Sequence, residues 1–285
     1  MTAPVGRRNW KGRCALLVLL AALAHPPSAV AQLKLEEVRP TYGRLGSTRP
    51  GTRVLPGEDL SVAYVVSGIT RGSDGRVEVS RRAELIDEAG QTVAQVPVKT
   101  DRIHLALGGD TLTSHMHFGL PIDFAPGKYR VRGLLRDVRG EADIAAEQEF
   151  EVLPLDFGIV RLRLAADEEG TTPVGGNLTV NQDVYVVGRA IGFAHKGGRI
   201  HVVGQMTIRD PQGRPTLPAP IAFEVHQEVD EDVDQFNLRW SMMANRPGNF
   251  TIHIEVADEF SDKRAAYEMP LMVRPPPPRE KSRTP

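Results

Sequence analysis

The chain has 285 residues, of which 41% are hydrophobic and 25% charged, with 35 basic and 36 acidic residues. This length has room for two ordinary domains, and the apolar content is too high for a wholly disordered chain. No Gly-X-Y or heptad period runs through the sequence, which excludes collagen-like and coiled-coil proteins.

The first 31 residues have the order of a signal peptide. Basic residues between Arg7 and Arg13 come first, then an apolar run from Cys14 to Ala24, then the small residues of Ala29-Val30-Ala31. The apolar run is shorter than the ~20 residues that a permanent membrane helix needs, which disfavours an uncleaved anchor. We therefore expect a signal peptide at 1–31, cleaved after Ala31, and a secreted or periplasmic protein without a membrane span.

Cleavage would change both the charge and the thiol content of the protein. Four basic residues leave with 1–31, so 31 basic and 36 acidic residues remain, a net charge near −5. An acidic chain without a basic stripe does not attract nucleic acid, so we expect no nucleic-acid partner. Cys14 is the single cysteine, so the mature chain would have no disulfide, thiolate nucleophile or cysteine metal ligand.

The rest of the chain contains an internal repeat of one unit. Pro126-Gly127-Lys128-Tyr129 and Pro247-Gly248-Asn249-Phe250 stand 121 positions apart. Further pairs at offsets of 121 to 124 are Asp59 and Asp183, Gly68 and Gly192, Asp87 and Asp210, Asp137 and Asp258, Ala145 and Ala266, and Val152 and Val273. We expect domain 1 at 33–153 and domain 2, its internal repeat, at 155–274.

In chain order, each half reads as short strands separated by turns. The β-rich runs lie at 60–66, 76–86, 184–190 and 199–208. The second and fourth of these runs lead into turns with Asp first and Gly fourth, which is the type I pattern. The strands that open at Tyr129 and Phe250 alternate apolar with polar residues, as strands with one buried face do. No segment has a sustained helical stripe.

About seven short strands in each half predict an all-β fold of two tandem immunoglobulin-like β-sandwich domains. In the Pro-Gly-x-aromatic opening and the Asp turn, at 126–152 and 247–273, the chain resembles the immunoglobulin-like or fibronectin-type-III-like repeats of bacterial secreted proteins. The cysteine pair of antibody domains is missing. The resemblance implies a binding or spacing module and assigns no functional residue.

Two segments connect or follow the predicted domains. The joint from Val152 to Asp156 is short, so we expect a semi-rigid pair. After Arg274 a run of four prolines begins a tail, 275–285, that we expect to be Pro-rich and disordered. The tail is a candidate docking segment, and a plain spacer is the favoured alternative.

Histidines offer one candidate metal site. His115 and His117 are two positions apart, so in a strand their side chains face the same way and could share a metal ion. No third ligand is near them in sequence, and a solvated strand face is the alternative. His104, His226 and His253 are isolated in the sequence.

Carboxylates offer a second candidate metal site. The densest acidic run, 228–234, contains Asp230, Asp232 and Asp234. Calcium prefers several carboxylate or carbonyl oxygens around one point, so this run is a candidate calcium site. A solvated acidic loop is the alternative.

No motif for catalysis stands out. The sequence has no Gly-x-Ser-x-Gly elbow and no phosphate-binding glycine loop. We therefore predict no catalytic residue, no cofactor and no enzymatic activity. We expect an exported binding or spacing module of the cell envelope, which recognises a protein or glycan through sandwich loops or edge strands. The alternatives are a periplasmic chaperone, with Arg161 and Arg163 as the basic residues near the joint, and a hydrolase or metal-dependent enzyme.

Overall fold

The computed structural model of the chain describes Met1 and residues 32–276. All regular structure in this part of the chain is β-strand, which confirms the predicted all-β fold. No described segment is a helix of the length and apolarity that a membrane span needs. Residues 2–31 of the predicted signal peptide and residues 277–285 of the predicted tail lie outside the described residues.

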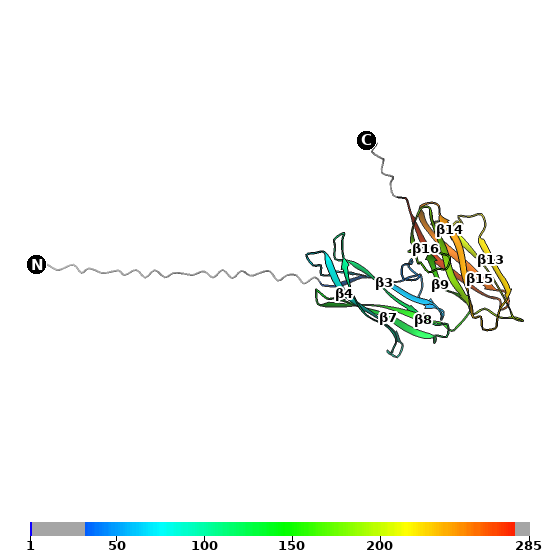
Figure 1. Ribbon diagram of the computed structural model, residues 1–285, viewed down its shortest axis with the longest axis horizontal. Helices are drawn as coiled ribbons and strands as arrows, with labels where there is room; N and C mark the ends of the chain where they lie inside the picture. Colours follow the sequence, from blue (N-terminus) through cyan, green and yellow to red (C-terminus); the bar gives the residue numbers. More distant parts are fainter. Residues whose placement is uncertain (2–31, 277–285) are drawn as a thin grey trace, which may run out of the picture. The chain divides into compact units, whose positions relative to one another are not determined.

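The first half of the chain forms one β-sandwich (Figure 1). Its strands are β1 Lys34–Pro40, β2 Arg53–Val54, β3 Asp59–Ser67, β4 Arg76–Asp87, β5 Thr92–His104, β6 Leu112–Gly119, β7 Gly127–Asp137 and β8 Ala142–Val152. They make a three-stranded sheet in the order β1-β3-β6 and a five-stranded sheet in the order β2-β8-β7-β4-β5. Inward-facing residues of both sheets, among them Val62, Val79 and Val131, share one hydrophobic core.

The second half forms another sandwich. Its strands are β9 Gly158–Ala165, β10 Asn177–Thr179, β11 Gln182–Ile191, β12 Arg199–Arg209, β13 Ile221–Glu228, β14 Gln235–Ala244, β15 Gly248–Asp258 and β16 Lys263–Arg274. The sheets have the orders β14-β11-β9 and β10-β16-β15-β12-β13, which are those of the first sandwich with every label raised by eight. The predicted fold of two tandem sandwiches is confirmed.

Each sandwich has eight strands, one more than the sequence predicted. The short strands β2 and β10 span two and three residues and pair in parallel with β8 and β16. Strands of this length have no detectable alternation in sequence, because alternation needs several residues. The domain limits at 33–153 and 155–274 remain predictions.

Two glycines matched by the repeat have the same backbone role. Gly68 follows β3 with φ +79°, and Gly192 follows β11 with φ +67°. A Cβ atom would lie 2.5 Å from the carbonyl oxygen of Gln32 in the first case and 2.3 Å from that of Asp156 in the second. Both positions therefore require glycine, for conformation and for space.

The sandwiches contact each other within one compact unit. Tyr42, in the loop after β1, is 5% exposed and belongs to the hydrophobic core of the second sandwich. Its hydroxyl donates to the carbonyl oxygen of Glu268 at 2.7 Å. Glu58, 3% exposed, accepts from Arg49 Nη1 at 2.8 Å and from the backbone N–H of Arg161 at 2.7 Å. A buried carboxylate thus joins the first sandwich to β9.

Candidate functional site

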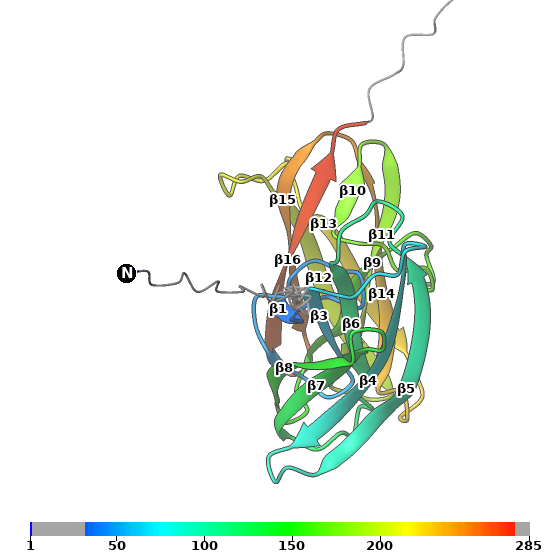
Figure 2. The ribbon, with the colours of Figure 1, turned by 90° about the vertical axis from the view of Figure 1, so that its left-hand side faces the viewer.

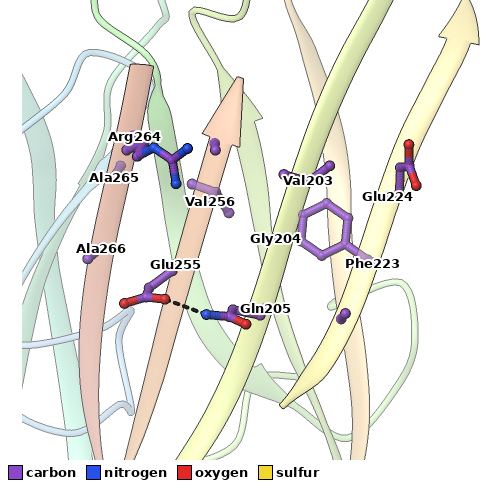
Figure 3. A pocket seen from close by; sticks show the side chains of 12 residues that line it. Val203, Gly204, Gln205, Phe223, Glu224, Glu255, Val256, Arg264, Ala265 and Ala266 are labelled. Atoms are coloured by element: carbon purple, nitrogen blue, oxygen red, sulfur yellow. Dashed lines mark hydrogen bonds between the residues drawn. The ribbon is translucent and has the colours of Figure 1, made fainter. Parts of the chain in front are cut away.

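A groove crosses the five-stranded sheet of the second sandwich (Figure 3). Its volume is about 840 Å³, and it is lined by 203–205 of β12, 222–224 of β13, 255–257 of β15 and 264–266 of β16. Phe223, Val256 and Ala265 pack in or against the core. Because side chains alternate along a strand, the residues next to these three face the opposite, outer side of the sheet.

Charged and amide side chains surround the small residues of this groove. Gln205 Nε2 donates to Glu255 Oε2 at 2.5 Å, and both side chains are labelled in Figure 3. The hydrogen bond with His253, and then that from Gln205, lower the pKa of Glu255. Glu224 and Arg264 complete the charged lining. The groove therefore carries two carboxylates and one guanidinium around Ala222 and Ala266.

The first sandwich has a smaller groove at the equivalent place. Its volume is about 330 Å³, and its lining includes 80–82 of β4, 134–136 of β7, Asp143 of β8 and Val98 of β5. At the offsets of the repeat, these positions correspond to 203–205, 255–257 and 264 of the second sandwich. The groove is thus a feature of the duplicated architecture, while its charge differs, since the first copy is lined by the guanidinium groups of Arg81, Arg82 and Arg136.

Beside the larger groove, three side chains form a cluster that sequence reasoning missed. His201 of β12 lies directly opposite His226 of β13, with stacked rings whose centroids are 4.4 Å apart. His201 Nε2 lies 2.9 Å from Glu224 Oε1. Within residues 32–276, these three are the one group of three histidine, cysteine or acidic residues with candidate metal-ligand atoms all within 4.8 Å.

The reason that sequence reasoning missed this cluster is the strand register. His226 is 25 positions from His201 in the sequence, and no other candidate ligand next to it indicated a shared site with His201. The segment 210–220 between β12 and β13 contains irregular structure, so its length does not set the pairing. The spacing of Glu224 and His226, two apart on an exposed strand face, was the available signal.

The predicted histidine pair lies on β6. His117 Nδ1 is 2.9 Å from Ser61 Oγ, and His115 shares the same strand face two residues away. Burial lowers the pKa of both imidazoles; nearby arginines add to this at His115, and Asp59 opposes it at His117. Among the described residues, no third ligand atom joins these two within 4.8 Å, and metal binding here remains a prediction.

The predicted calcium ligands lie in the connection between β13 and β14. Asp230, Asp232 and Asp234 are all exposed. The backbone N–H of Val233 donates to the carbonyl oxygen of Asp230 at 3.1 Å, which closes a turn. The three carboxylates do not form a group with mutual distances of 4.8 Å, and calcium binding here also remains a prediction.

The two arginines near the joint already have partners inside the protein. Arg161 Nε donates to the carbonyl oxygen of Gly57 at 3.0 Å, and its guanidinium pairs with Asp59 at 3.4 Å. Arg163 Nη2 donates to the carbonyl oxygen of Gly170 at 2.9 Å. These contacts hold both guanidinium groups within the protein, and a chaperone role for them remains a prediction.

No known protein family matches the sequence, and no curated protein matches it. Among solved structures, the chain is similar to red sea bream transglutaminase, at 13% identity over 85% of this chain and 31% of that chain, with a TM-score of 0.29. It thus spans about a third of that protein. It is also similar to the C-terminal domain of BspA, a Streptococcus agalactiae AgI/II polypeptide, at 10% identity over 85% of this chain and 99% of that chain, with a TM-score of 0.27.

The prediction that the chain is not an enzyme is wrong. It is contradicted by one of the solved structures above, which is that of a transglutaminase, an enzyme; at a TM-score of 0.29 this likeness assigns no activity to the chain. Physically, the prediction rested on missing motifs within short stretches of sequence. The sheet nevertheless brings together His201, Glu224 and His226 from two strands, so missing local motifs do not exclude chemically active groups.

Proposed function

We propose that the chain is an exported binding module of the cell envelope that holds an extended polypeptide segment of a partner protein. The observation that carries this proposal is the groove at the same place in both sandwiches, on the five-stranded sheet of each. A module that is duplicated together with its groove presents two related binding surfaces, which suits a partner with more than one segment to hold. Export is supported by the signal-peptide order of residues 1–31.

The edge strands favour the second sandwich as the main site. β5 and β13 are the terminal strands of the two five-stranded sheets, and Figure 2 shows β5 at the margin of its sheet. β5 contains Pro97, and its pairing with β4 shifts between Arg81 and Ala83. Proline and irregular pairing hinder the addition of another strand. β13 contains no proline and pairs with β12 without a shift, so its outer edge is open to a partner strand.

The charge of the larger groove indicates the kind of segment. Glu224 and Glu255 lie in its lining with Arg264 as the single cationic residue. A partner strand on β13 would place alternate side chains on the same face as this groove, beside Glu224, and long side chains could extend into it. We therefore propose a segment with a lysine or arginine among small residues, since a basic side chain would complement the two carboxylates.

The test places a bulky side chain in the larger groove and at the matching position of the first sandwich. Ala266 is an exposed small residue of the larger groove, and Ala145 is its counterpart in the repeat. Peptides are selected from a displayed library against the chain from Gln32 onward, and their affinities are then measured for Ala266→Trp and Ala145→Trp. We expect Ala266→Trp to weaken binding about tenfold or more, because the indole would occupy the groove, and Ala145→Trp to weaken it less.

Selected peptides should be enriched in basic residues, and their binding should weaken as salt is raised. The proposal is overturned if no peptide is selected, or if selected peptides bind Ala266→Trp as tightly as the unaltered chain. Circular dichroism of both variants checks that the sandwiches are intact.

A further inference from the structure

The cluster of His201, Glu224 and His226 has the donor set of a transition-metal site. The two imidazole rings are nearly parallel, with an angle of 15° between their planes, and Glu224 Oε1 lies 2.9 Å from His201 Nε2. The His201 side chain is 23% exposed and that of Glu224 is 62% exposed. An ion could therefore reach the three side chains from solvent without any movement of the backbone.

A neighbouring aromatic ring supports one side of the cluster. Phe260, in the turn between β15 and β16, meets His201 edge to face at 5.8 Å and His226 at 6.3 Å. The backbone N–H of Glu259 donates to the carbonyl oxygen of His201 at 2.9 Å, which fixes this turn against β12. Packing of this kind limits the rotation of the His201 imidazole, and a restricted ligand loses less conformational entropy on binding an ion.

The first sandwich shows what the same positions hold when no such cluster is present. At the offset of the repeat, His201 corresponds to Glu78, and the residue paired with Glu78 across the strands is Arg102. Arg102 Nε lies 3.3 Å from Glu78 Oε2, an ordinary surface ion pair. One cross-strand position therefore carries opposite charges in the first copy and two metal-ligating side chains in the second.

We propose that His201, Glu224 and His226 bind one zinc ion. Two imidazole nitrogens and one carboxylate oxygen are a set that zinc accepts, whereas calcium and magnesium prefer oxygen ligands throughout. Ligand atoms of tetrahedral zinc lie about 3.3 Å apart, so the exposed side chains of Glu224 and His226 close on His201 by rotation when the ion binds. The fourth position of the ion is open to water or to a donor group of a bound partner.

The site differs from the predicted histidine pair in the first sandwich. His115 and His117 face the same side of one strand, and no third ligand atom lies within 4.8 Å of both among the described residues. His201 and His226 come from two paired strands and have Glu224 as a third ligand. The first pair is therefore a matched control for the second.

The experiment is a calorimetric titration of the tag-free chain from Gln32 onward with zinc chloride, and separately with calcium chloride. We expect one zinc per chain and no comparable heat from calcium. The variant His201→Glu/His226→Arg rebuilds the ion pair of the first sandwich and should abolish zinc binding while the fold is kept. His226→Gln, which removes one ligand only, should weaken zinc about tenfold or more, and His115→Asn/His117→Asn should leave it unchanged.

Three results would overturn the proposal. They are no heat with about 100 μM zinc, which would saturate a site with a dissociation constant of about 1 μM; binding that survives in His201→Glu/His226→Arg; and binding lost only in His115→Asn/His117→Asn. If circular dichroism shows that His201→Glu/His226→Arg does not fold, His226→Gln is used instead, and unchanged zinc affinity in that variant would overturn the proposal. The visible spectrum of bound cobalt, which reports tetrahedral nitrogen and oxygen ligands, checks the geometry independently.

Discussion

At the scale of single residues, His115 shows how the sheet alters the chemistry of one side chain. The imidazole is half-buried on β6, and loss of hydration disfavours its charged form. The positive charges of Arg44, Arg39 and Arg81 act in the same direction. Together they lower the pKa of His115 from the ordinary value of 6.5, so the folded protein disfavours the charged form of this ring.

This shift predicts a pH dependence of stability. As the pH is lowered through 6.5, His115 takes up its proton at a higher pH in the unfolded chain than in the folded chain. The free energy of unfolding therefore contains a contribution that is fully present above pH 6.5 and decreases as the pH falls through the range below it. In His115→Gln this part of the decrease should be missing. Urea unfolding of both proteins at several pH values measures it.

A direct control is the NMR titration of the His115 ring. A pKa at or above 6.5 in the folded protein would contradict the shift. His117 needs separate assignment in the same spectra, because the carboxylate of Asp59 opposes the effect of burial on that ring.

At the scale of elements, two aspartates close the last hairpin of each sandwich. Asp137 and Asp258, at the ends of β7 and β15, are 1% and 0% exposed. Asp137 Oδ2 accepts from the backbone N–H of Thr70 at 2.7 Å, and Asp258 Oδ2 from that of Ala194 at 2.8 Å. The other oxygen of each accepts backbone N–H groups of the following turn. One carboxylate therefore ties a turn to a distant loop.

Replacement of Asp258 should destabilise the second sandwich. Asp258→Ala leaves the partly buried backbone N–H groups of Ala194 and Phe260 without an acceptor, and removes the partner of the Ser261 hydroxyl. Since hydrogen bonds to a charged group contribute most, we expect a loss of about 2–4 kcal/mol in the free energy of unfolding. Asp232→Ala, an exposed loop change, is the control. Equal unfolding midpoints in urea for the two variants would contradict this role.

The sequence predicted the position of these aspartates but not their partners. The offset of the repeat matched Asp137 with Asp258 and placed both at turns. That their carboxylates reach Thr70 and Ala194, 67 and 64 positions away, follows only from the packing of one sheet on the other. The strands were likewise predicted from alternation, whereas their register was not.

At the scale of the whole molecule, a buried network links the sandwiches through Glu58. The side chains of Arg49 and Glu58 are 10% and 5% exposed, and Glu58 Oε1 also accepts from the N–H groups of Asp59 and Arg161. Removal of one member of a buried ion pair leaves the other charge without compensation. Loss of the Glu58 carboxylate would therefore affect both sandwiches.

Glu58→Ala should therefore lower the free energy of unfolding by about 3–5 kcal/mol and uncouple the sandwiches. By scanning calorimetry we expect one thermal transition for the unaltered chain and two for the variant. Gln182, the counterpart of Glu58 at the offset of the repeat, accepts only from the N–H of Thr179 at 3.1 Å. Gln182→Ala is thus the matched control and should keep a single transition. A single, unshifted transition in Glu58→Ala would refute the coupling.

The sequence by itself determined the all-β fold, the duplication, and the glycines and aspartates at the turns. These follow from alternation over a few residues and from turn chemistry, both of which are local. Only the tertiary structure decided the pairing of His201 with His226, the recurrence of the groove and the contacts of Glu58. The physical reason is that each of these depends on strand register or on packing between residues far apart in the chain, which no local pattern specifies.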